Sequence, residues 1–174
     1  KYAFNKCISL NEIIIPNSIT TIGEHSFEEC TSLKELFIPE GVQYIEEFCF
    51  SKCSSLEYVF ISKSLIKIGE NAFLKNSSLK LMAIPHSFKN NKIIDQNIKM
   101  NVIYNDENSK CLNNYAKELF KERHNPRILG KSMKYFKMAA DDGNVDGMFN
   151  YAYKNDIGEG TPINKEEAIK YYKM

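Results

Sequence analysis

The chain repeats a set of apolar residues every 23 positions, and this period limits the possible folds more than any other feature. Four phenylalanines, Phe4, Phe27, Phe50 and Phe73, follow one another at this step. A repeat of this size is too small to bury its own apolar face, so a fixed period predicts a solenoid of stacked repeats. Three other columns keep the same step: Cys7, Cys30 and Cys53; Leu10, Leu33, Leu56 and Leu79; Ile15, Ile38, Ile61 and Ile84.

Each repeat is expected to contain two short extended segments. In the second repeat the apolar residues Leu36 and Ile38 are two positions apart, which predicts a strand. Pro39 ends that strand because it has no backbone N–H to donate to a ladder. A second extended segment is predicted through residues 42–45. The turn into the next repeat is assigned to a glycine, Gly23 or Gly69.

The cysteine column is expected to hold free thiols. Strands in a sheet lie ~4.8 Å apart, which places the Cα atoms of the column within the disulfide range of ~4.4–6.8 Å. Parallel Cβ vectors, however, do not suit a bond that needs Cβ atoms near ~3.8 Å. Asn76 takes the fourth place in the column, which argues against an obligatory bridge or metal. We therefore expect small buried apolar groups, and the redox compartment stays open.

The repeats closely resemble those of the BspA-like leucine-rich repeat family. One repeat reads Phe27-x-x-Cys30-x-x-Leu33-x-x-Leu36-x-Ile38-Pro39-x-x-Val42-x-x-Ile45, and Ala72-Phe73 carries the Ala-Phe pair that opens the family pattern. The departures are few: Ser26 and Cys49 replace the alanine, Asn76 the cysteine and Ser62 the proline. The resemblance covers residues 1–104. It implies protein–protein recognition or adhesion, and it implies no catalysis.

The strand face turned away from the core is the candidate binding surface. If Leu36 and Ile38 point inward, their neighbours point outward, on the face that is usually concave in such solenoids. A row of exposed apolar and aromatic side chains suits protein binding, since aromatics dominate interface hot spots. The alternative is that these side chains only stabilise the sheet by cross-strand stacking. The predicted partner-binding residues are Glu12, Ile14, Glu35, Phe37, Tyr58 and Phe60.

Residues 105–126 are predicted to cap the stack and to link it to the following region. A segment rich in Asn and Lys loses the period at Asn91, and a last strand is predicted at 101–104. Apolar residues at helical spacing then predict a helix over residues 109–122, with Ser109 as its N-cap. A solenoid needs an atypical element over its terminal repeat, and we assign this role to the strand and helix. The Asn-Pro pair at 125–126 marks the junction.

Residues 127–174 follow a second period, of 36 residues. Tyr135-Phe136-Lys137-Met138 recurs as Tyr171-Tyr172-Lys173-Met174. Small residues between these segments allow helices to approach closely, and Gly158 and Gly160 supply a turn between antiparallel helices. Helices are predicted at about 129–142, at 145–156 and from Asn164 onward.

This second region resembles the Sel-one-like repeat family of tetratricopeptide-like helical hairpins. The matching residues are Gly147, Tyr151-Ala152, Gly158, Gly160, Ala168 and Tyr135-Phe136-Lys137-Met138-Ala139-Ala140, while Asn155 and Thr161 depart from the pattern. About one and a third repeats are counted, fewer than the ~3 that are stable alone. The resemblance implies an adaptor role in protein complexes. The predicted fold is thus an α+β repeat protein, a leucine-rich-repeat β-solenoid joined to a tetratricopeptide-like helical array.

Residues 142–147 match the first six positions of a calcium loop. The twelfth position should be a bidentate Glu, but it is Tyr153. An interhelical turn with Asn144 or Asp146 near an N-cap is the preferred interpretation. The remaining candidates form no catalytic or metal-binding pattern: His25, His86 and His124 are scattered, and Glu28-Glu29 and Glu46-Glu47 are expected on solvated edges.

We predict a non-enzymatic protein–protein interaction scaffold whose partner is another protein. Nucleic acid, cofactors, metals and small-molecule substrates are not expected, and the net charge of +1 creates no basic field. No apolar stretch reaches the ~18 residues of a membrane span. The alternatives are a cell-surface adhesin or antigen, the targeting region of a larger enzyme, and a calcium-regulated scaffold. Since the chain begins and ends within repeats, we expect a fragment. Its compartment stays open between the cytoplasm, which is slightly favoured, and the cell surface.

Overall fold

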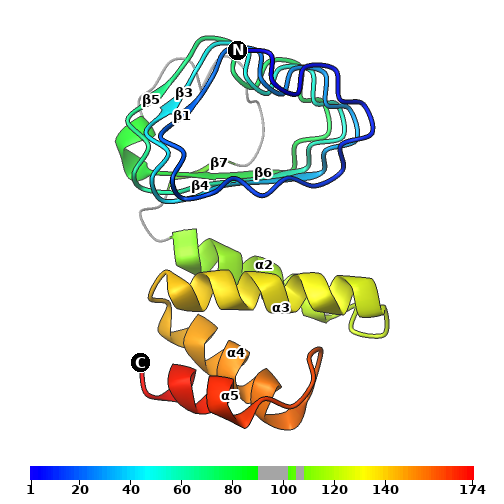
Figure 1. Cartoon of the computed structure of the whole chain (residues 1–174), viewed down its shortest axis with the longest axis vertical. Coiled ribbons are helices and arrows are strands. Elements are labelled where there is room, and N and C mark those ends of the chain that lie inside the picture. The colour runs from blue at the N-terminus through cyan, green and yellow to red at the C-terminus, as the bar shows by residue number, and fades with distance from the viewer. Residues whose placement is uncertain (90–101, 105–107) are drawn as a thin grey trace. The chain divides into compact units, whose positions relative to one another are not determined.

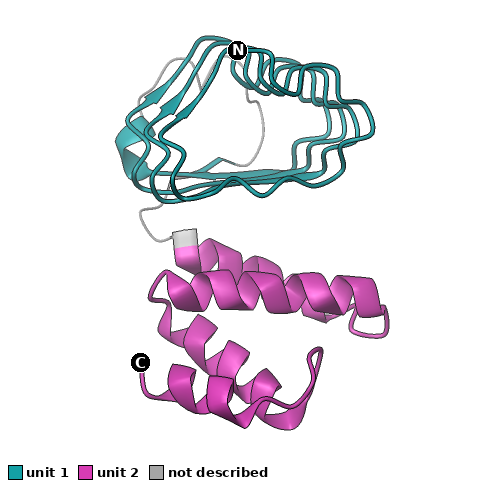
Figure 2. Cartoon of the chain, viewed as in Figure 1, with its two compact units in different colours: residues 1–106 teal, residues 107–174 magenta. Residues whose placement is uncertain are grey.

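The computed structural model describes residues 1–89, 102–104 and 108–174. The chain divides into two compact units, Lys1–Asp106 and Glu107–Met174 (Figure 2). We call them unit 1 and unit 2. Unit 1 is a chain of short strands wound into successive turns, each of which we call a coil, and unit 2 is made of helices (Figure 1).

Unit 1 is a β-solenoid, as the 23-residue period predicts. Two parallel sheets run along the solenoid, and the second and third coils each add one strand to both. In the larger sheet Leu36 lies opposite Val59, one period later in the sequence. The larger sheet has the order β2 (Glu35–Ile38), β4 (Tyr58–Ile61), β6 (Leu81–Ile84) and β7 (Val102–Tyr104), and the smaller sheet the order β1 (Thr21–Ile22), β3 (Tyr44–Ile45) and β5 (Lys67–Ile68).

Strand ends follow the predicted pattern. β2 stops at Ile38, directly before Pro39. The last predicted strand is confirmed as β7, which pairs with β6 so that Met82 lies opposite Val102. A short 3-10 helix, η1 (His86–Phe88), follows β6. The predicted loss of the period at Asn91 lies outside the described residues.

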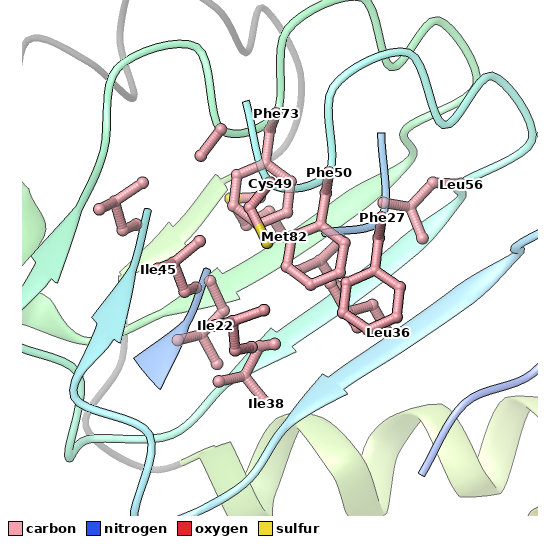
Figure 3. Packing of buried hydrophobic residues seen from close by; sticks show 14 of the residues in the cluster. Ile22, Phe27, Leu36, Ile38, Ile45, Cys49, Phe50, Leu56, Phe73 and Met82 are labelled. Carbon is pink, nitrogen blue, oxygen red and sulfur yellow. The ribbon is translucent and has the colours of Figure 1, made fainter. Parts of the chain in front are cut away.

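In the core of unit 1 equivalent side chains stack one coil above another, and in the phenylalanine column they are identical (Figure 3). The ring of Phe27 stacks on Phe4 and on Phe50 at centroid distances of 5.1 Å, and Phe50 stacks on Phe73 at 5.5 Å. The planes of neighbouring rings differ by at most 14°. Because each coil supplies the same residue at the same place, the column continues through the solenoid.

Two corners of the coil are made by left-handed residues other than glycine, whereas the turn after β2 uses a glycine, Gly41 at φ +108°. A Cβ at Gly69 would lie 2.5 Å from the backbone nitrogen of Glu47, so this glycine is needed for close stacking of coils. The turn assigned to Gly23 or Gly69 is therefore not made by a left-handed glycine. The left-handed conformation costs an L-residue about 1–2 kcal/mol. Eight residues in two columns adopt it: Tyr2, His25, Phe48 and Asn71; Lys6, Glu29, Lys52 and Lys75.

Hydrogen bonds between coils offset the cost of these corners. The amide of His25 donates to the carbonyl of Glu47 at 3.1 Å, and the amide of Glu29 donates to the carbonyl of Ser51 at 2.9 Å. Both donors are left-handed residues. The corner geometry therefore places these backbone donors within hydrogen-bond distance of acceptors in the next coil, so that these backbone groups are satisfied.

Unit 2 contains four described helices: α2 (Asn108–Phe120), α3 (Pro126–Asp141), α4 (Val145–Ile157) and α5 (Lys165–Tyr172). Their positions confirm the predicted helices. Ser109 lies inside α2, so the N-cap predicted there is wrong. Asn125, Asn144 and Asn164 cap the other three helices, and each side chain accepts a hydrogen bond from a first-turn amide. Gly158, at φ +75°, ends α4 in the left-handed conformation.

Consecutive helices of unit 2 pack on one another. The hydroxyl of Ser132 in α3 donates to the carbonyl of Ala116 in α2 at 2.7 Å. A Cβ at Gly147 would lie 2.9 Å from the Cβ of Ala139, so the glycine lets α4 approach α3 closely. In the part of the chain that the structure describes, none of the helices is long and apolar enough to cross a membrane.

Candidate functional site

The pairing of the larger sheet defines the predicted binding surface. Leu36 and Ile38 are buried in the solenoid core, as predicted. Alternate residues of each strand therefore point to the opposite face of the sheet. The outward residues form two columns, in which Glu35 lies opposite Tyr58 and Tyr58 opposite Leu81, while Phe37 lies opposite Phe60 and Phe60 opposite Ala83.

The exposure of the predicted residues differs widely. Glu12 and Ile14 lie before the first strand of the larger sheet, in a segment without a strand; Ile14 is 76% exposed, and Glu12 is also exposed. Phe60 has no exposed surface, so the prediction of an exposed ribbon is wrong at that position. In the sheet Phe60 lies between Phe37 on one neighbouring strand and Ala83 on the other. Alternation along a strand predicts the direction of a side chain, but it does not predict how much of that side chain is exposed. The half-buried members are Glu35, Phe37 and Tyr58.

Charged side chains lie beside the apolar ones. Lys80 forms an ion pair with Glu57 at 2.8 Å, one period away in the sequence. Its ammonium also lies 5.9 Å from the centroid of the Tyr58 ring. Glu12 and Glu35 are one period apart in the sequence.

A second cluster, at a corner of unit 1, was missed by the sequence analysis. The ring of His25 stacks between Tyr2 and Phe48, at centroid distances of 4.8 and 5.0 Å. Its Nδ1 lies 2.7 Å from a carboxylate oxygen of Glu28, and Lys52 lies 3.0 Å from the other oxygen. The side chain of Glu28 is mostly buried, so the solvated edge predicted for it is wrong. The available signal was the 23-residue step between opposite charges, as between Glu29 and Lys52.

The ion pairs set the ionisation of Glu28. Burial would raise the pKa of its carboxyl group, but the hydrogen bonds from His25 and Lys52 lower that pKa overall. An ionised carboxylate therefore belongs to the folded corner, where it joins one coil to the next.

The five cysteines are free thiols. The thiols of Cys30 and Cys53 donate to the carbonyl groups of Phe4 and Phe27 in the preceding coil, each at 3.2 Å. Burial raises the pKa of the Cys53 thiol to about 12. Cys30 and Cys53 act as small buried residues whose thiols satisfy backbone acceptors. Reactive thiols instead need an electropositive, partly exposed environment that lowers their pKa.

A third cluster joins two helices of unit 2. The ammonium of Lys137 in α3 donates to Asp141 at 2.7 Å and to the hydroxyl of Tyr171 in α5 at 2.9 Å. The hydroxyl of Tyr171 donates to the same carboxylate group. Burial would lower the pKa of Lys137, but these hydrogen bonds raise it overall. The sequence signal for this cluster was the four-residue spacing of Lys137 and Asp141 on one helix.

The segment that matched part of a calcium loop is an interhelical turn. Asp142 follows α3, and Gly143 is left-handed at φ +85°. The side-chain oxygen of Asn144 accepts from the amide of Gly147 at 2.7 Å and caps α4. This confirms the predicted turn with Asn144 as N-cap. Among residues 1–89, 102–104 and 108–174, no group of three or more His, Cys, Asp or Glu side chains is placed to hold a metal ion.

Comparison with known proteins identifies a family of repeats. The family model described as BspA type leucine rich repeat region matches residues 1–121 in six copies. The match spans the solenoid and extends through α2. No curated protein and no solved structure matches the chain.

Proposed function

The chain belongs to the family of BspA type leucine rich repeats, and from this we propose that it is a non-enzymatic protein-binding scaffold. The proposed site is the outward strand face of unit 1. The observations that carry the proposal are the partly exposed Phe37 on the outward face of β2 and the exposed Ile14 one period before it in the sequence. The inward columns fill the core, so the apolar surface that Ile14 and Phe37 leave exposed is offered to a partner.

The partner should present apolar side chains to this face, because Ile14 and Phe37 offer apolar surface there. Tyr58 adds an aromatic surface in the same column as Glu35. Phe60 has a different role in this proposal from the one predicted. It is buried directly opposite Phe37 and supports that residue.

The experiment compares two substitutions of equal chemistry on different faces. Partners captured by the immobilised chain and crosslinked to it are identified by mass spectrometry. Ile14→Ser combined with Phe37→Ser should remove the specific partner, with an unchanged circular dichroism spectrum. Ile66→Ser is the matched control, because Ile66 is exposed but lies next to the smaller sheet. Equal capture by the double variant and the control would reject the strand face as the site.

For unit 2 we propose two helical hairpins of the Sel-one-like type, α2–α3 and α4–α5. The rings of Tyr115 and Tyr135 meet edge-on at 5.1 Å and 68°. Exactly one 36-residue period later, Tyr151 and Tyr171 meet edge-on at 4.9 Å and 82°. The repeated contact supports a first repeat that begins in α2, whereas the sequence analysis assigned residues 105–126 to a cap and linker. Small buried residues recur at the same step: Ala116 and Ala152, Ser132 and Ala168.

A further inference from the structure

The 36-residue period allows the surfaces of the two helical hairpins to be compared position by position. In the first hairpin three positions are covered, and their counterparts in the second hairpin are exposed. The pairs are Asn113 (1% exposed) and Phe149 (58%), Met133 (6%) and Ile169 (51%), and Phe136 (1%) and Tyr172 (46%).

Helix α4 and the turn after it cover the three positions of the first hairpin. The side-chain amide of Asn150 donates to Asn113 at 3.1 Å. The ammonium of Lys154 lies 5.5 Å from the centroid of the Phe136 ring. A Cβ at Gly160 would lie 3.0 Å from Cγ of Met133. The surface that α4 occupies on α2–α3 therefore recurs, uncovered, on α4–α5.

The uncovered surface is more apolar than the covered one. Phe149 replaces Asn113, and its ring lies 6.2 Å from Tyr172 and 6.1 Å from Tyr153. Along α4, exposed apolar residues recur every four positions and so share one face of the helix. These residues are Val145, Phe149, Tyr153 and Ile157. Of these, Phe149 has a covered counterpart in the first hairpin, and with Ile169 and Tyr172 of α5 it forms what we call the α4–α5 face.

We propose that the α4–α5 face binds a further helical hairpin of the same kind, whose first helix lies on it as α4 lies on α2–α3. The contact inside the chain between the first hairpin and α4 shows the occupant in place at the equivalent surface. Burial of exposed apolar groups drives such docking. This inference rests on the two-hairpin proposal for unit 2 and is independent of the strand face of unit 1.

The test extends the full chain by a copy of its own residues 139–174, joined directly after Met174. This junction keeps the 36-residue period and supplies Ala139-Ala140, the pair that faces Gly147 in the existing contact. The extended chain should stay monomeric in sedimentation velocity and gain helical circular dichroism. Amides of α5 should exchange at least ~10-fold more slowly, and Tm should rise by about 5 °C.

Two substitutions in the original copy give the matched comparison. Phe149→Asp should abolish the slower exchange and the rise in Tm. Asp146→Ser should preserve both, because Asp146 is an exposed residue on the side of α4 that faces Lys117 of α2. Circular dichroism of the unextended variants establishes that both fold.

The possible failures are distinguishable. Gain of helix without protection of α5 would mean that the hairpin folds but does not dock, which overturns the inference and leaves the two-hairpin proposal standing. No gain of helix would overturn both. An unextended chain that dimerises, and that Phe149→Asp returns to monomer, would make a second copy the occupant and would also overturn the inference.

Discussion

Replacing Phe50 by Ala tests whether the stacked phenylalanine column stabilises unit 1. The ring of Phe50 has no exposed surface and lies between Phe27 at 5.1 Å and Phe73 at 5.5 Å. Phe4 belongs to the same column but is 43% exposed and stacks on Phe27 at the edge of the described coils. The same substitution at both positions therefore compares the middle of the column with its end.

The expected costs differ severalfold. Truncation of a fully buried Phe costs about 3–5 kcal/mol in the free energy of unfolding, through lost burial and the cavity that remains. This loss includes two aromatic contacts of ~0.5–1.5 kcal/mol each. At Phe4 one such contact is lost and much of the side chain already faces water, so we expect about 1–2 kcal/mol. The free energy of unfolding of a typical domain is ~5–15 kcal/mol, so Phe50→Ala should remove a large share of the stability of unit 1.

The assay must report on unit 1 separately from the helices. Hydrogen exchange with mass spectrometry on peptides from β2 and β4, recorded across a urea series, meets this need. Phe50→Leu retains more of the side-chain volume than Phe50→Ala and should therefore lower the free energy of unfolding by less. Equal losses at Phe4 and Phe50, or a loss below ~1 kcal/mol at Phe50, would refute a continuous aromatic core.

Two further predictions concern pH. Because the pKa of Glu28 is lowered, its carboxylate stabilises unit 1 at pH values above the ordinary carboxyl pKa of about 4.3. This stabilisation is lost as the pH falls through the lowered pKa. Glu28→Gln should therefore flatten the fall in urea midpoint between pH 5 and pH 3; an unchanged profile would remove Glu28 as the cause. The raised pKa of Cys53 stabilises the fold below the ordinary thiol pKa of about 8.5, and the stabilisation declines as pH rises toward 12. At pH 10 the decline should be about 1–2 kcal/mol, and Cys53→Ala should lack it; an equal decline in the variant would contradict the assignment.

Much of the fold could be predicted because the period carries tertiary information. Residues one period apart become neighbours, so the inward columns at Leu36 and Ile38 followed from spacing alone. Pro39 marked a strand end for a local covalent reason. The helices of unit 2 were placed by their apolar spacing and by glycine at the turn.

The errors fall where local preference met a tertiary constraint. Left-handed corners suggested glycine, yet residues such as His25 and Glu29 adopt this conformation because hydrogen bonds between coils stabilise it. Glu28 was expected in water, but the stacked ring of His25 and the ammonium of Lys52 enclose it. The outward direction of Phe60 was deduced correctly, while its burial was not.

The sequence by itself determined which side chains stack, since a constant step puts like residues at like places in every coil. It also determined several strand and helix ends, at Pro39, Asn144 and Gly158, since these residues act on the backbone beside them. The tertiary structure alone decided how much of each outward side chain meets water, because exposure depends on every group packed around it. For that reason the candidate face is narrower than the pattern indicated, and the uncovered α4–α5 face became visible only in three dimensions.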